Sequence, residues 1–111
     1  MGILEQTRQR QEARRNRREA RSLRQQLKAE SRSYIDRLCA DIWSETGDIG
    51  QAESITKTKV EADSQVYGFD PATILLLLQL ALAIYKALKY MNVLSPTPEV
   101  VTAFFEGSES D

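Results

Sequence analysis

Basic side chains are the residues of this sequence best suited to do chemistry, and they are concentrated near its N-terminus. Residues 1–37 hold eleven of the fifteen lysines and arginines against five acidic residues, a charge of +6, whereas residues 38–111 carry −7. Such an asymmetry indicates an acidic partner for the basic end. If residues 10 to 32 form one continuous helix, eight cations share an arc of about 120°. They are Arg10, Arg14, Arg17, Arg18, Arg21, Arg24, Lys28 and Arg32.

A row of guanidinium groups is suited to phosphate. The planar fork of arginine matches phosphate oxygens, and each contact with nucleic acid releases counterions, so affinity falls steeply with salt. No aromatic residue precedes Tyr34, so we expect binding to the backbone and neither base stacking nor sequence reading. Lipid headgroups would supply the same phosphate chemistry. Two alternatives remain: an acidic protein surface, including that of a neighbouring copy, or a solvated helix stabilised by its own Glu–Arg pairs.

Catalytic chemistry is not expected from this composition. The chain has no histidine and one cysteine, Cys39, which excludes a zinc cluster, a histidine-based catalytic pair and an internal disulfide. We expect Cys39 to be an inert, half-buried thiol in a helix. The nearest acidic cluster, Asp41 to Glu53, spans a glycine-containing break without the pattern of a calcium loop. The sequence therefore predicts a protein that is not an enzyme and has no metal or cofactor.

The basic residues need a helix to position them, and the first segment, residues 1–46, predicts one long basic amphipathic helix. Between Ile3 and Thr46 there is no glycine or proline, and good helix formers dominate. Ala13, Ala20, Leu27 and Tyr34 recur every seven residues. Polar residues occupy the companion positions, so we expect a narrow packing seam instead of a stable coiled coil.

The second segment, residues 47–69, predicts a polar connector with a short helix. Gly47, Asp48 and Gly50 predict a turn after the long helix. Residues 51–67 are the least distinct part of the sequence, because the run from Ile55 to Val60 would also accept an extended strand. We favour a helix for residues 51–67.

The third segment, residues 70–94, predicts an apolar helix that starts with Asp70 as the N-cap and Pro71 in the first turn. Residues 71–85 contain no charge. A helix so apolar fits the interior of a bundle or oligomer, a bilayer span over residues 72–94, or the core of a monomer. The side expected to make the oligomer or membrane contact carries Ile74, Leu77, Ala81, Ile84, Leu88 and Met91.

The fourth segment, residues 95–111, predicts a short helix with Thr97 as cap and Pro98 in its first turn, followed by an acidic tail. The predicted fold class is therefore all-α: a long extended N-terminal helix, a poorly defined middle segment, an apolar helix and a short C-terminal helix. We expect oligomerisation to complete this fold, because apolar residues are nearly absent from residues 5–22 and dense from Ile74 onward.

These features together predict a non-enzymatic structural or assembly protein of a multi-copy complex. A virion component fits, such as an internal, connector or ejection protein of a bacteriophage. Its partners would be copies of itself, other subunits and the DNA backbone, and it would be found in a virion or a cytoplasmic assembly. The alternative is a small single-span or membrane-inserting protein with residues 72–94 in the bilayer.

Overall fold

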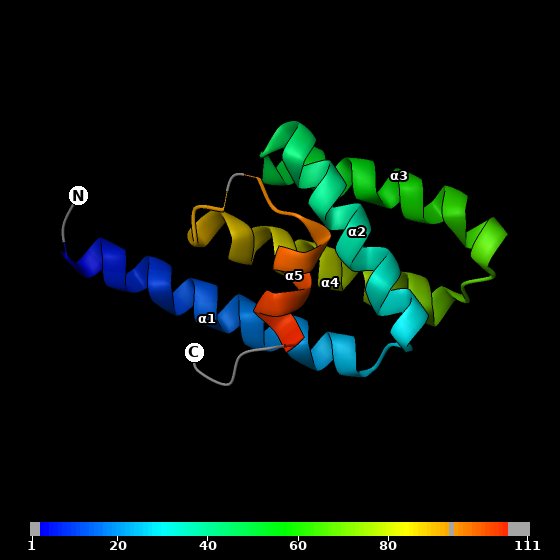
Figure 1. The fold of residues 1–111 in the computed structure, drawn as a ribbon, viewed down its shortest axis with the longest axis horizontal. Helices are drawn as coiled ribbons and strands as arrows, with labels where there is room; N and C mark the ends of the chain where they lie inside the picture. The colour runs from blue at the N-terminus through cyan, green and yellow to red at the C-terminus, as the bar shows by residue number, and fades with distance from the viewer. Residues whose placement is uncertain (1–2, 94, 107–111) are drawn as a thin grey trace.

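The computed structural model describes residues 3–93 and 95–106, which fold into helices joined by short turns (Figure 1). In chain order these are α1 (Ile3–Gln25), α2 (Ala29–Thr46), α3 (Ile49–Tyr67), α4 (Pro71–Tyr90) and α5 (Pro98–Glu106). They make one globule with extents of 47 × 28 × 22 Å, and the described ranges contain no strand. The prediction of an all-α fold is confirmed.

The chain does not form the single helix predicted for residues 1–46, because it turns between Gln25 and Ala29. Gln26 N donates to Leu23 O (3.1 Å) and Leu27 N to Arg24 O (3.0 Å), which closes α1 with a tightened last turn. Lys28 is extended, and α2 begins at the next residue. One straight helix over 46 residues would be roughly 69 Å long, well beyond the 47 Å long axis of the molecule. The turn instead lets both halves pack on one core.

The middle of the chain is a well-packed helix, which corrects the expectation of a poorly defined segment and confirms the choice of helix over strand. Gly47 ends α2 with a φ of 63°, and its N–H donates to Trp43 O. The Asp48 carboxylate then caps α3 by accepting from Gln51 N at 2.9 Å. Ala52 and Val60 are fully buried on the inner side of α3. The burial of these two apolar side chains stabilises the helix by more than the weak strand propensity of the segment opposes it.

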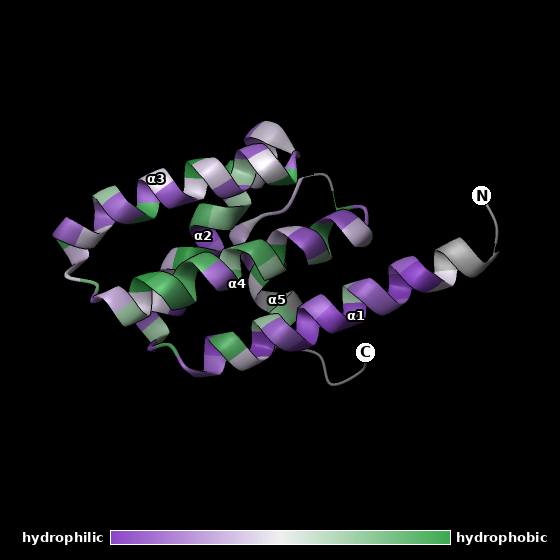
Figure 2. Cartoon of the chain, turned by 180° about the vertical axis from the view of Figure 1, so that it is seen from behind, coloured by the Kyte–Doolittle hydropathy of each residue, from purple (hydrophilic) through white to green (hydrophobic). Residues whose placement is uncertain are grey.

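The centre of the fold is α4, with α1 antiparallel along one side and α3 on the other, while α2 crosses it (Figure 1). Asp70 caps α4 by accepting from Thr73 N at 2.7 Å, and Pro71 occupies the first turn, as the sequence predicts. Figure 2 shows α4 as the most hydrophobic helix and α1 as largely hydrophilic. The buried side chains of α4 include Leu77, Leu80 and Ile84. The hydrophobic core of this chain is thus built around its one strongly apolar segment.

The short helix α5 lies across α2 and α1. Val101 and Phe105 bury its inner side, and Val100 N donates to the Thr97 hydroxyl at 3.2 Å, which is the predicted cap. The connection from α4 is held by Trp43, whose indole Nε1 donates to Val93 O at 2.7 Å. The predicted acidic tail, residues 107–111, lies outside the residues that the structure describes.

Candidate nucleic-acid interface

The outward side of α1 carries exposed arginines. Residues 3–25 contain eight arginines and three glutamates, a charge of +5. The exposed arginines project within an arc of about 160°, calculated at 100° per residue, and no acidic residue of α1 falls inside that arc. They are Arg8, Arg10, Arg14, Arg15 and Arg18.

The inward side of α1 is what orients this arc toward solvent. Ala13, Asn16 and Ala20 are buried at 6%, 5% and 0% exposure, and they line the side of α1 that faces the body. Two alanines let the helix backbones approach closely, and the amide of Asn16 is satisfied within its own helix, donating to Glu12 O at 2.8 Å. The arginines opposite this seam therefore point away from the rest of the chain.

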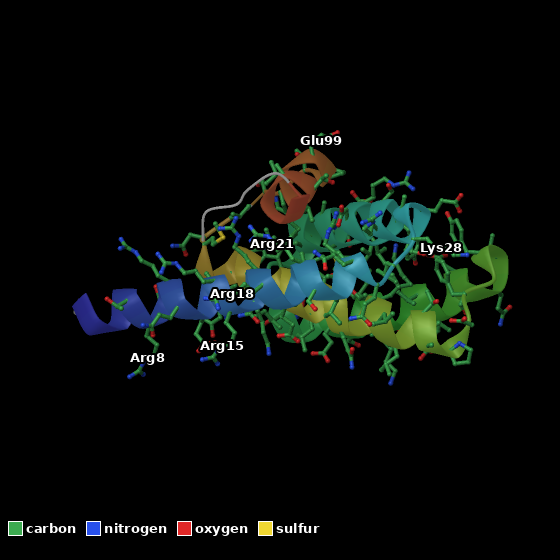
Figure 3. All side chains as sticks on the ribbon, turned by 90° about the horizontal axis from the view of Figure 1, so that it is seen from below. Arg8, Arg15, Arg18, Arg21, Lys28 and Glu99 are labelled. Carbon is green, nitrogen blue, oxygen red and sulfur yellow. The ribbon has the colours of Figure 1, made fainter. Side chains whose placement is uncertain are left out.

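The N-terminal half of α1 extends past the end of the globule (Figure 1). From Thr7 to Glu12 no residue is fully buried, and burial begins at Ala13. Figure 3 shows Arg8 and Arg15 on one side of α1 and Arg21 on the other. Arg15 also pairs with Glu12 across one helical turn at 3.4 Å. That pair is largely exposed, so it contributes little to stability and leaves the guanidinium accessible.

The predicted stripe is divided by the fold. Arg10, Arg14 and Arg18 are exposed, whereas Arg17 and Arg21 are half-buried at the edge of the helix contact. Lys28 is exposed but sits in the turn after α1, and Arg32 is half-buried on α2. The continuous surface predicted from Arg10 to Arg32 therefore ends at α1.

Arg24 is the clearest correction to the predicted binding residues. Its side chain is 3% exposed and forms an ion pair with the Asp36 carboxylate of α2, itself 4% exposed. The second carboxylate oxygen of Asp36 accepts from the Thr102 hydroxyl of α5 at 3.0 Å. The Arg24 guanidinium also lies over the Phe105 ring, 5.9 Å from its centroid. Arg24 thus links α1 to α2 and α5, and its side chain is too buried to contact a ligand.

Sequence reasoning missed Arg8 and Arg15, which lie outside the 120° arc chosen for the stripe. Both are exposed in the structure. The signal was present in the seven-residue repeat of Ala13, Ala20 and Leu27, because that repeat marks the inward side. Choosing the outward arc as the opposite of this seam, instead of as the densest row of cations, would have included them.

The residues predicted to make an oligomer or membrane contact are mostly in the core of the chain. Leu77, Ile84 and Leu88 are fully buried and Ala81 is 2% exposed. The other two, Ile74 and Met91, are half-buried. The four buried side chains pack against the other helices of the same chain, so in this fold they give no free surface to a neighbouring copy.

A groove of about 530 Å³ separates α2 from α5. Asp36 lines it, but its carboxylate is already bound by Arg24 and Thr102, so it cannot serve as an open ligand. The residues that the structure describes contain no cluster of three or more acidic or cysteine side chains placed to hold a metal. The lining residues are Ser33, Asp36, Arg37, Pro98, Glu99, Thr102 and Ala103.

Three buried titratable groups belong to the packing of the core. Burial raises the pKa of the Cys39 thiol to about 12. Burial also raises the pKa of Tyr85, whose hydroxyl lies 2.5 Å from that of Thr56. Burial, together with a hydrogen bond donated to Asp63 at 2.6 Å, raises the pKa of Tyr34. All three groups are therefore neutral at physiological pH, which makes them poor nucleophiles.

Comparison with known proteins returned no relative: no family model, no curated protein and no solved structure matches this chain. The surface chemistry of the chain itself therefore carries the functional argument.

Proposed function

We propose that this chain is a non-enzymatic structural protein that binds the phosphate backbone of nucleic acid through the exposed arginines of α1. The observation that carries the proposal is the set of five exposed guanidinium groups on the outward side of one helix, with no acid among them. Phosphate is the anion that such a set suits, because each guanidinium can donate two parallel hydrogen bonds to phosphate oxygens. A multi-copy assembly that packages nucleic acid, such as a bacteriophage virion, is a setting that fits this chemistry.

The spacing of the exposed arginines along α1 supports the nucleic-acid backbone as their ligand. Arg8 and Arg18 are ten residues apart, which is roughly 15 Å along a helix. Duplex DNA carries one charge per about 1.7 Å of its axis, so several phosphates lie within that span. Seven of the sixteen acidic residues lie on α2 and α3, and only three lie on α1 beside its eight arginines. The local field at the arginines is therefore positive even though the whole chain carries −1.

The test is a salt titration of binding to random-sequence duplex DNA. If four to five arginines each neutralise one phosphate, log K should fall with log salt with a slope of roughly −4. Replacing Arg10 and Arg14 with glutamine should flatten that slope by about 1.8. The matched control is Lys57→Gln with Lys59→Gln, which removes the same charge from the exposed side of α3 and should leave the slope unchanged. Binding that does not respond to salt would rule out phosphate as the ligand.

A second candidate function, membrane insertion, is favoured by one observation. By length and composition α4 can span a bilayer, with a mean hydropathy of 1.8 over its most apolar 18 residues. Against it, 44% of that window is buried inside the chain, so α1 and α3 would have to separate from α4 before insertion. Sedimentation of the purified chain without detergent distinguishes the two functions. A discrete soluble species supports nucleic-acid binding, and solubility that depends on detergent supports insertion.

A further inference from the structure

The N-terminal half of α1 differs from an ordinary surface helix because it stands clear of the body. Between Thr7 and Glu12 only Gln9 and Glu12 are partly covered, and Gln11 is exposed like its arginine neighbours. A helix packed along its whole length on a globule presents only one face to a ligand. A helix that projects can be surrounded by its ligand, and Figure 1 shows this end of α1 projecting.

Arg8 and Arg10 of this projecting part, together with Arg14 and Arg15 of the next turn, form two rows. At 100° per residue, Arg8 and Arg15 lie about 130° around the helix from Arg10 and Arg14. Figure 3 shows the first row, Arg8 and Arg15, on one side of α1. Between the rows lie the exposed side chains of Thr7, Gln11 and Arg18, which can donate or accept hydrogen bonds. The two rows are placed to contact two separate lines of phosphates at once, such as the two sides of a groove. The hydrogen-bonding side chains between the rows would point into the space between those two sides.

From this geometry we propose that the N-terminal half of α1 enters the major groove of duplex DNA, an inference that rests on the function proposed above. Arg8 and Arg15 would bind phosphates of one strand, and Arg10 and Arg14 those of the other. Thr7 and Gln11 would then face the base edges.

The dimensions agree with this placement. An α-helix with side chains is about 10–12 Å across, and the major groove of B-DNA is about 12 Å wide. The corresponding groove of A-form RNA is deep and too narrow to admit a helix. A single strand provides one wall and not two, and residues 3–25 contain no aromatic side chain on which unpaired bases could stack. Duplex DNA is therefore the nucleic acid that uses both rows.

The contact of α1 with the other helices limits how far α1 can enter the groove. From Ala13 onward one side of α1 is covered, so only the first turns can be enclosed, while Arg18 and the half-buried Arg21 remain at the mouth of the groove. The exposed ion pair of Arg15 with Glu12 must open or be shared for Arg15 to reach a phosphate. Pairs of this kind are weak, so the loss is small beside a new phosphate contact.

The experiment compares the Kd of the full chain for duplex DNA, duplex RNA and single-stranded DNA of equal length in the same buffer. We expect duplex DNA to bind at least about tenfold more tightly than the other two. Dimethyl sulfate methylates guanine N7, which lies in the major groove, so bound duplex should be protected at guanines inside the footprint. Each row variant, Arg8→Gln with Arg15→Gln and Arg10→Gln with Arg14→Gln, should reduce both the preference and the protection. The Lys57→Gln, Lys59→Gln chain should change neither.

The outcomes separate the two proposals. Equal affinity for all three nucleic acids, or guanine N7 reactivity unchanged at saturation, overturns the groove placement while leaving backbone binding intact. No binding to any of them at low salt overturns both. Thermal melts of the row variants show whether they fold, because replacing exposed arginines on one helix should leave the melting temperature nearly unchanged.

Discussion

Replacing Arg24 with methionine should destabilise the chain far more than the same change at any exposed arginine of α1. Arg24 and Asp36 are 3% and 4% exposed, so the ion pair is out of water. Removing the guanidinium takes the cationic partner from a buried carboxylate, and breaking a buried pair in this way costs about 3–5 kcal/mol. A domain of this size has only about 5–15 kcal/mol of total stability.

The thermal consequence can be worked from chain length. Unfolding entropy of about 2.1 cal/mol/K per residue makes each kcal/mol worth roughly 4 °C in a chain of 111 residues. The Arg24→Met chain should therefore melt about 12–20 °C below the original protein. Urea unfolding followed by circular dichroism gives the free energy directly. The matched control is Arg14→Met, the same substitution at an exposed position of the same helix, for which we expect a change within about 0.5 kcal/mol.

A double-mutant cycle isolates the pair itself. Combining Arg24→Met with Asp36→Leu removes both charges, and such replacements by apolar side chains are commonly neutral or stabilising by about 1–4 kcal/mol. The double variant should thus recover most of the loss, giving a coupling of several kcal/mol between the two sites. If Arg24→Met costs no more than Arg14→Met, the buried ion pair does not exist in solution and the account of α1 docking is wrong. Salt-dependent DNA binding by the double variant should match the original chain, because Arg24 has no exposed surface.

The remaining predictions concern the core and the helix ends. Because the folded pKa of Tyr85 is raised above the usual value of about 10, the folded state holds this proton longer. This stabilisation is complete below pH 10 and is lost as pH rises above it, so urea midpoints should fall between pH 10 and 11. Cys39, fully buried and with a pKa of about 12, should resist a thiol reagent at pH 8 until urea unfolds the chain, and prompt labelling would contradict its placement. Gly47→Ala should cost about 1 kcal/mol because its φ is +63°, whereas Gly50→Ala, within α3, should cost less.

Local signals in the sequence predicted the starts of α4 and α5 correctly. Asp70 followed by Pro71, and Thr97 followed by Pro98, start α4 and α5 through hydrogen bonds that span three residues. Such caps depend on the cap residue and the next turn alone, so neighbouring sequence is sufficient to find them. The run of uncharged residues after Pro71 likewise predicted a helix that must be covered by other groups.

The turn at residues 26–28 could not be found in the same way. Gln26, Leu27 and Lys28 are all good helix formers, and no glycine or proline interrupts them. The chain breaks there because folding back buries Leu27 and Tyr34 against the same core, and that gain depends on where α4 lies. A preference of a few tenths of a kcal/mol for helix at three positions is smaller than the burial of two large side chains.

For the candidate interface as well, the sequence predicted one part and only the tertiary structure decided the other. Charge content and helical winding, both readable from the sequence, determined that the N-terminal segment is a helix rich in arginine. Which arginines meet water was decided only by tertiary contacts: Arg24 is drawn inward by Asp36, twelve residues away along the chain, while Arg8 and Arg15 remain outside. The physical reason is that helix formation depends on neighbours within one turn, whereas exposure depends on packing between segments that the sequence keeps far apart.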